Sequence, residues 1–149
     1  MDDVTWHVRV SSESKDSSNV YVRRHRFEVG ASLAFDPEHS RITALEYLLG
    51  ALGADLAGTF RMVARRRRLP VDNVEVTLSG ELNNPLTYLA VVGEKGHPGL
   101  DRVTGKVYAS TNAPQEEVQR VWAETLARSP LVNTLKRAAQ LDITLQVVP

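Results

Sequence analysis

The sequence predicts an α+β fold with a mostly antiparallel sheet around a long, buried central helix. Segments of alternating apolar and polar residues follow one another in pairs, and one long stretch with helical periodicity lies between two such groups. Paired strands with short connections are typical of antiparallel sheets, whereas regular alternation of strands and helices would indicate a parallel sheet. A length of 149 residues suits one domain, expected at residues 1–149, with a sizeable core.

The N-terminal part is expected to consist of strands. Residues 4–10 alternate with an apolar side chain at every second position, and the polar residues 11–19 are typical of a hairpin loop. Residues 20–29 are expected to resume as a second strand. Residues 30–40 are expected to form a short strand followed by a loop.

A central helix is expected at residues 45–63. Its large apolar residues fall on one stripe, and five small residues cover most of the remaining surface. Because each glycine costs roughly 1 kcal/mol of helix propensity relative to alanine, we expect another backbone to pack close against the small residues. The stripe contains Leu45, Leu49, Leu52, Leu56, Phe60 and Val63, and the small residues are Gly50, Gly53, Ala54, Ala57 and Gly58.

Four consecutive arginines follow at positions 65–68. Cations at a helix C-terminus complement the helix dipole and can bind the last carbonyls. This interpretation is favoured over a nucleic-acid patch, because 18 acidic residues balance 18 basic ones and no aromatic residue interleaves the run. Zero net charge gives no general attraction to nucleic acid or membrane, and no uncharged apolar run reaches the roughly 18 residues of a membrane span.

The second half of the chain begins with two strands, at residues 71–83 and 100–111, which are expected to pair in antiparallel fashion. The segment between them, at 84–99, is longer than a hairpin loop and apolar at its start, which indicates a short helix or a lid. A second helix is expected within residues 111–129. A third begins with Ser129 as its N-cap and proline at its first position, and a final strand follows.

Several kinds of chemistry are excluded by composition. Cysteine is absent, which excludes disulfides, thiolate metal sites and thiol catalysis. The four histidines lack metal-ligand spacing, and no phosphate loop, serine elbow or zinc signature occurs, so no metal and no cofactor are expected. The first ten residues do not resemble a secretory signal, which makes a cytoplasmic location the default expectation.

One acid, Asp55, lies within the apolar central helix. An unpaired carboxylate there would cost several kcal/mol, so it must be solvated, paired with a cation or protonated. Glu46 could be proposed as its acid/base partner. On an ideal helix, however, nine residues separate the two by about 13 Å along the axis and about 180° around it. They could meet only across a subunit boundary.

Two motifs resemble signatures of the OsmC/organic hydroperoxide resistance family. "ALEYLLGALGAD" at 44–55 is similar to the central-helix signature P-x-E-L-L-x-A-L-x-x-C, and "SPLVNTL" at 129–135 is similar to C-P-V-S-x-T-L. The basic helix end and the later strands also fit the family's layout. The resemblance implies an OsmC-like fold and an intertwined homodimer with two equivalent sites at the interface. A dimer of this kind agrees with the small residues on the central helix, which need a close neighbour.

Family members are thiol peroxidases, in which one cysteine attacks an organic hydroperoxide and a second resolves it as a disulfide. On this sequence the two cysteine positions are taken by Asp55 and Ser129, while Glu46 matches an acid in the helix signature. A carboxylate and a hydroxyl cannot be oxidised and recycled as thiols are, so thiol-dependent peroxidase activity is expected to be absent. No catalytic residue is assigned, and the assisting arginine is left open between Arg23, Arg24, Arg26 and Arg41.

The candidate binding residues are Asp55, Ser129, Glu46 and Thr59. The first hypothesis is a non-peroxidase homologue, linked by family to the hydroperoxide stress response, that binds a small apolar or amphipathic molecule at the dimer interface. The apolar stretch 86–92 and the acid favour a ligand with a basic or hydroxyl group. One alternative is a hydrolase- or isomerase-like enzyme that uses Asp55; another is a purely structural or partner-binding dimer. For Ser129, a simple helix cap is the competing interpretation, and for Asp55, an ion pair with an arginine.

Overall fold

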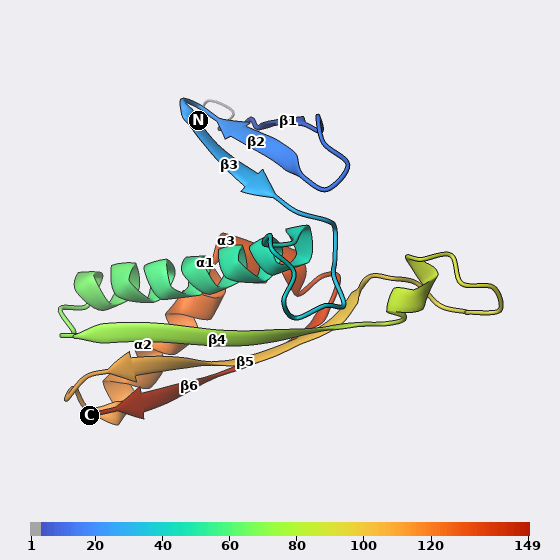
Figure 1. Ribbon diagram of the computed structural model, residues 1–149. Helices are drawn as coiled ribbons and strands as arrows, with labels where there is room; N and C mark the ends of the chain where they lie inside the picture. Colours follow the sequence, from blue (N-terminus) through green and yellow to red (C-terminus); the bar gives the residue numbers. More distant parts are fainter. Residues whose placement is uncertain (1–3) are drawn as a thin grey trace. The chain divides into compact units, whose positions relative to one another are not determined.

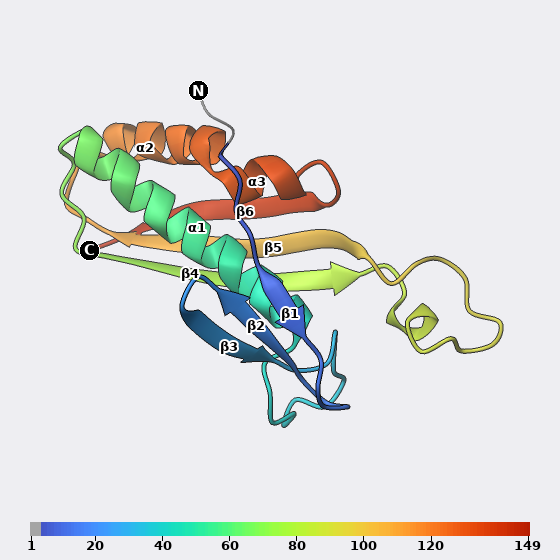
Figure 2. The same ribbon diagram turned by 90° about the horizontal axis from the view of Figure 1, so that it is seen from above.

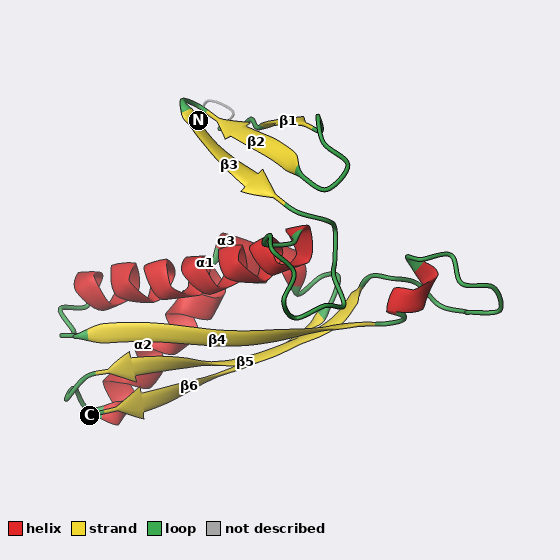
Figure 3. Ribbon diagram, viewed as in Figure 1, coloured by secondary structure: helices red, strands yellow, loops and turns green. Residues whose placement is uncertain are grey.

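The computed structural model describes residues 4–149 as two three-stranded sheets, a long helix and two shorter helices (Figures 1 and 3). The chain divides into two compact units, residues 1–50 and residues 51–149, and each is described by itself. The order of strands and helices confirms the predicted α+β class. A single domain stays a prediction. The elements are β1 Arg9–Ser11, β2 Ser18–Val22, β3 His25–Val29, α1 Ala44–Arg66, β4 Asn73–Leu82, the 3₁₀ turn η1 Pro85–Thr87, β5 Leu100–Ser110, α2 Gln115–Arg128, α3 Pro130–Leu135 and β6 Gln140–Val148.

The first unit contains the antiparallel sheet β1-β2-β3. The predicted single strand over 20–29 is wrong, because the chain reverses between β2 and β3. Val22 pairs with His25, and Arg23 takes a left-handed conformation with a φ of 53°. The sequence carries no glycine, asparagine or proline at this turn, so nothing in the alternating pattern indicates that the chain reverses here.

Two further predictions for the first unit need correction. The strand predicted at 4–10 begins only at Arg9, where pairing with β2 starts. The short strand predicted within 30–40 is absent from the described residues. The backbone there binds the segment before α1 instead: Gly30 N–H donates to Ile42 O at 2.8 Å, and Ala44 N–H donates to Ala31 O at 3.0 Å. The start of this segment is thus bound to the residues around the beginning of α1 and not to a neighbouring strand.

The second unit contains the sheet β4-β5-β6. The predicted antiparallel pairing of β4 with β5 is confirmed, with Asn73 opposite Ser110 at one end of the ladder. β6 pairs with β5 in parallel, because the connection through α2 and α3 carries the chain back to the starting end of β5. β6 is therefore an edge strand of this sheet, covered by no further strand of the described chain.

The predicted apolar stripe of α1 is confirmed in the second unit, where Leu52, Leu56, Phe60 and Val63 are fully buried. Seen from above in Figure 2, α1 crosses over the sheet. Gly53 faces it, because a Cβ there would lie 3.6 Å from a methyl group of Val76 on β4. The rest of this core comes mainly from β5 and α2, with Val103, Val107, Val118 and Val121.

Ala51, Ala54 and Gly58 of α1 lie on a face that the second unit leaves open. A Cβ at Gly58 would have no atom within 4 Å, and Ala51 and Ala54 are exposed. The close neighbour expected for these residues is not among the described residues of the chain, so it stays a prediction about a partner.

The basic end of α1 is located as predicted, with Arg65 and Arg66 in the last helical turn. Beyond it, Arg67 forms an ion pair of 2.7 Å with Glu124 of α2. The segment between β4 and β5 forms the short helix η1, which was one of the two expectations for it. Among residues 4–149 no helix combines the length and apolar character needed to cross a membrane.

Candidate functional site

Asp55 and Ser129, the residues at the two signature positions, are in direct contact. Asp55 lies in the middle of α1 and is half-buried, while Ser129 lies between α2 and α3 and is fully buried. The Ser129 hydroxyl donates a hydrogen bond to Asp55 Oδ2, and the Leu131 backbone N–H donates to the same oxygen at 3.0 Å. Asp55 and Ser129, which are 74 positions apart in the chain, are thus joined by a hydrogen bond.

The Ser129 side chain is also the predicted N-cap of α3. Its Oγ accepts a hydrogen bond of 3.1 Å from Val132 N–H, and Pro130 occupies the first helical position. Its backbone N–H donates to Thr125 O at 2.9 Å and closes the end of α2. One residue therefore ends one helix, begins the next and donates to the acid on α1, so the cap interpretation is confirmed together with the contact to Asp55.

The partners of Asp55 explain how the chain holds an acid at this place. The first N–H groups of a helix have no partner within the helix, and negative charge is favourable near them. Asp55 satisfies one such group, that of Leu131, and takes the Ser129 hydroxyl as a second donor. Among the described residues no lysine, arginine or histidine forms an ion pair with it. The expected arginine partner is thus not found among the described residues of the second unit, and a pairing with an arginine of the first unit stays a prediction.

The second carboxylate oxygen of Asp55, Oδ1, accepts fewer hydrogen bonds than Oδ2. Its contact within the described chain is the Thr59 hydroxyl, one helical turn further along α1, at 3.4 Å. That distance is long for a hydroxyl donor, so Oδ1 retains capacity to accept a stronger hydrogen bond. Thr59 is itself buried. Three of the four candidate binding residues therefore lie together around one carboxylate.

Glu46 is used differently, at the start of α1. Its Oε1 accepts from the Thr43 hydroxyl at 2.7 Å and from the Thr43 backbone N–H at 3.0 Å, while Glu46 N–H donates to Thr43 Oγ1 at 3.2 Å. This reciprocal pattern is a capping box, a local signal that sequence reasoning missed at Thr-x-x-Glu. The Thr43 hydroxyl and then its backbone N–H hold the pKa of Glu46 below its ordinary value, so the charged cap persists into mildly acidic solution.

The arginine candidates lie in the first unit, where Arg41 forms an ion pair with Glu28. Tyr47 donates its hydroxyl hydrogen to the Glu28 carbonyl at 2.9 Å, and its ring lies 5.1 Å from that of Phe27. Arg23, Arg24 and Arg26 are exposed in the β2–β3 hairpin. Within residues 4–149 no three histidine, aspartate or glutamate side chains gather in a way that could hold a metal ion.

Comparison with known proteins adds the family context. The model of the OsmC-like protein family matches residues 37–144, a range that includes Asp55 and Ser129. No curated protein matches the sequence significantly.

Solved structures show the same fold at low sequence identity. The OsmC-like protein from Mycoplasma pneumoniae has a TM-score of 0.82 and 15% identity, with both chains covered completely. A hypothetical protein from Aquifex aeolicus VF5 has a TM-score of 0.75 and 14% identity, with 98% of each chain covered. The organic hydroperoxide resistance protein OsmC from Legionella pneumophila has a TM-score of 0.65 and 14% identity over 97% of this chain and 98% of its own.

The hydrogen bonds around Asp55 predict a measurable coupling in stability. Asp55→Ala leaves the Ser129 hydroxyl and the Leu131 N–H without their acceptor, so it should lower the free energy of unfolding by about 2 kcal/mol. Ser129→Ala removes a cap and a donor and should cost about 1–2 kcal/mol. The double variant should cost less than the sum of the two, as measured by urea denaturation.

The exposed Ser79→Ala on β4 is the matched control and should change the free energy of unfolding by less than about 0.5 kcal/mol. Strict additivity of Asp55→Ala and Ser129→Ala would show that the two side chains do not interact in solution.

Proposed function

Because the chain belongs to the OsmC-like protein family, we propose that it is a member without thiol peroxidase activity that binds a small molecule at Asp55. The family is linked to hydroperoxide resistance through members such as the proteins from Legionella pneumophila and Bacillus subtilis. The observation that carries the proposal is the hydrogen bond between Asp55 and Ser129, the residues at the positions of the family's two cysteines. A cytoplasmic location stays a prediction.

The chemistry of these two side chains supports the loss of peroxidase activity. A thiol peroxidase needs a thiolate that becomes a sulfenic acid and is then resolved as a disulfide. None of the 149 residues is a cysteine, so no other position can supply this chemistry. Ser129 is also fully buried, which argues against a role as the nucleophile of a hydrolase, because a nucleophile must reach its substrate.

The free capacity of Asp55 Oδ1 supports a binding role for the acid. Oδ2 already accepts two hydrogen bonds, whereas Oδ1 has, among the described residues, only the long contact with Thr59. A ligand hydroxyl or ammonium group would be a suitable donor to Oδ1, because hydrogen bonds to a charged acceptor are the stronger ones. Ser129 would then orient the carboxylate. Glu46 remains part of the proposal through its exposed side chain, although its Oε1 is held by Thr43.

We also propose that the chain forms a homodimer and that the ligand lies at its interface. Large apolar side chains near the N-terminus are strongly exposed in the described chain; Trp6 is 80% exposed. The open face of α1 carries Ala51, Ala54 and Gly58, with Met62 beside them. Exposed apolar surface of this kind is typical of an interaction site, and small residues allow two helices to approach closely.

A peroxidase assay tests the loss of thiol chemistry. The full chain, incubated with an organic hydroperoxide and a dithiol reductant, should consume hydroperoxide no faster than buffer with the same reductant. The Asp55→Cys/Ser129→Cys variant tests whether the two positions can carry thiol chemistry. It should form an intrachain disulfide on oxidation, because the two native side chains are in contact. Thiol-dependent turnover by the unmodified chain would refute the proposal.

A thermal-shift screen with small amphipathic amines and alcohols tests the binding role of Asp55. A ligand that donates to Oδ1 should raise the unfolding temperature of the native chain, because a ligand that binds only the folded state stabilises it. Asp55→Asn should reduce this shift at least twofold for an amine, since the neutral amide attracts a cation less. Thr77→Ala, an exposed threonine on β4, is the control and should leave the shift unchanged. An equal shift in Asp55→Asn would exclude Asp55 from the site.

The oligomeric state tests the dimer. Sedimentation equilibrium should give about twice the chain mass of 16.5 kDa. Gly58→Ala should weaken the dimer although it adds roughly 1 kcal/mol of helix propensity, because the added methyl group would meet the partner. The exposed Gln119→Ala on α2 should not affect association. A monomer at all concentrations, with Gly58→Ala simply more stable, would contradict the proposed packing.

A further inference from the structure

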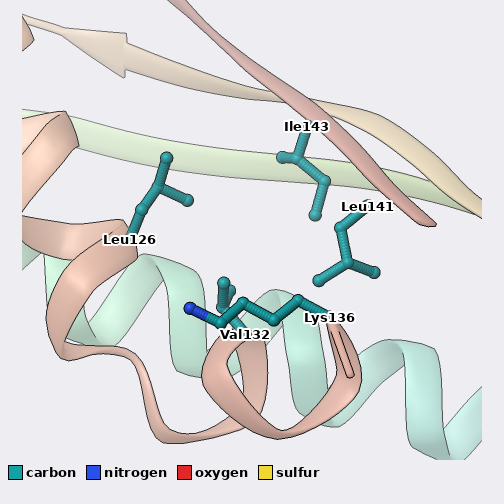
Figure 4. Close-up of a pocket in the computed structure, with 5 residues that line it drawn as sticks. All are labelled: Leu126, Val132, Lys136, Leu141 and Ile143. Carbon is teal, nitrogen blue, oxygen red and sulfur yellow. The ribbon is translucent and has the colours of Figure 1, made fainter. Parts of the chain in front are cut away.

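A second feature of the second unit lies away from Asp55, between the end of α2, α3 and the edge strand β6. It is a cavity of about 230 Å³ lined by Leu126, Val132, Lys136, Leu141 and Ile143 (Figure 4). Leu126 comes from the end of α2, and the two β6 residues point toward α3. Asp55 does not line this cavity, and nothing in the proposed function depends on it.

The lining has a simple chemical character: four branched aliphatic side chains and one ammonium group. In Figure 4 the Lys136 side chain extends past Val132, with its nitrogen on the side of Leu126. Lys136 is exposed, so its stem can add apolar surface beside Val132 while its ammonium group stays in contact with water.

Lys136 forms no ion pair within residues 4–149. Two acids on the neighbouring elements α2 and β6 are already engaged. Glu124 is held by Arg67 and Arg128, both at 2.7 Å, and Asp142 is held by Arg102 at 2.6 Å. The apolar cavity therefore has one cation at its rim with no acidic partner from the described chain.

The walls of the cavity are held by hydrogen bonds. The Asn133 amide donates to Leu126 O and Ala127 O, both at 3.1 Å, and to Ser129 O at 2.7 Å, which ties α3 to the end of α2. Val132 donates its N–H to Ser129 while its side chain lines the cavity. A site whose walls are tied in this way loses little freedom when it binds a ligand, which favours binding.

We propose that this cavity binds a small monocarboxylate with an unbranched apolar tail, with the carboxylate paired to Lys136. An apolar cavity of about 150 Å³ holds benzene, with six heavy atoms, so by proportion one of 230 Å³ holds about nine. Octanoate has about this size. Its tail would contact Leu126, Leu141 and Ile143, and its carboxylate would supply the negative charge that Lys136 lacks.

The test is a calorimetric titration of the full chain at neutral pH with octanoate, 1-octanol and octylamine. Octanoate should bind about fivefold more tightly than octanol, which has the tail without the charge, and octylamine should bind most weakly. Lys136→Met should lower the affinity for octanoate about fivefold and leave octanol unchanged. Lys106→Met, at an exposed lysine of β5, is the matched control and should change neither.

Two measurements establish where octanoate binds. Leu141→Trp fills the cavity and should abolish binding of both octanoate and octanol. Should that variant fail to fold, methyl NMR of the native chain replaces it, and octanoate should shift the signals of Leu126 and Ile143.

Three results would overturn the proposal. They are no saturable octanoate binding at millimolar concentration, equal affinity for octanoate and octanol, and equal effects of Lys136→Met and Lys106→Met. Methyl shifts that appear on self-association of the chain and not on addition of octanoate would also overturn it, because they would show that a second copy fills the cavity.

Discussion

The hydrogen bonds that Ser129 and Leu131 donate to one oxygen of Asp55 join the three helices of the second unit. Asp55 lies on α1, Ser129 closes α2, and the Leu131 N–H belongs to the first turn of α3. Because Ser129 is fully buried, its hydroxyl would be costly to leave without an acceptor. The position of α3 against α1, and with it the shape of the surface that α3 forms with β6, depends on this contact.

The same contact connects the fold with the chemistry that the chain can perform. The resemblance of the two sequence motifs implies that Asp55 and Ser129 stand where relatives carry thiols; in this chain the two side chains are an acceptor and a donor, whose contact stabilises the helices and cannot be oxidised as thiols can. A fold can be retained while the chemistry at its site changes, since packing and reactivity depend on different properties of the same side chains.

The second unit offers two environments of opposite chemical character. Asp55 presents a carboxylate oxygen with free accepting capacity, which suits a donor or a cation, whereas the cavity beside β6 presents aliphatic walls and the ammonium group of Lys136, which suit an apolar anion. Both are shaped by the turn between α2 and α3, where Ser129 and Asn133 hold the backbone. A change in this turn would therefore affect both environments together.

Local sequence patterns were sufficient to predict features that depend on residues close together in the chain. The apolar stripe of α1 follows from helical spacing, and the cap at Ser129 follows from its place before Pro130. The hairpin at Arg23 was missed because its turn lacks the usual residues. That Ser129 lies near Asp55 was implied by the family resemblance and not by any local pattern, and the second donor, the Leu131 N–H, was not foreseen because it lies more than seventy positions away. The parallel pairing of β6 and the cavity beside it likewise depend on segments brought together only by folding. Sequence by itself determined the main helices, the strands β4, β5 and β6 and the absence of redox thiols. Tertiary structure decided what the acid at position 55 binds, because hydrogen bonds between distant residues leave no periodic pattern in a chain.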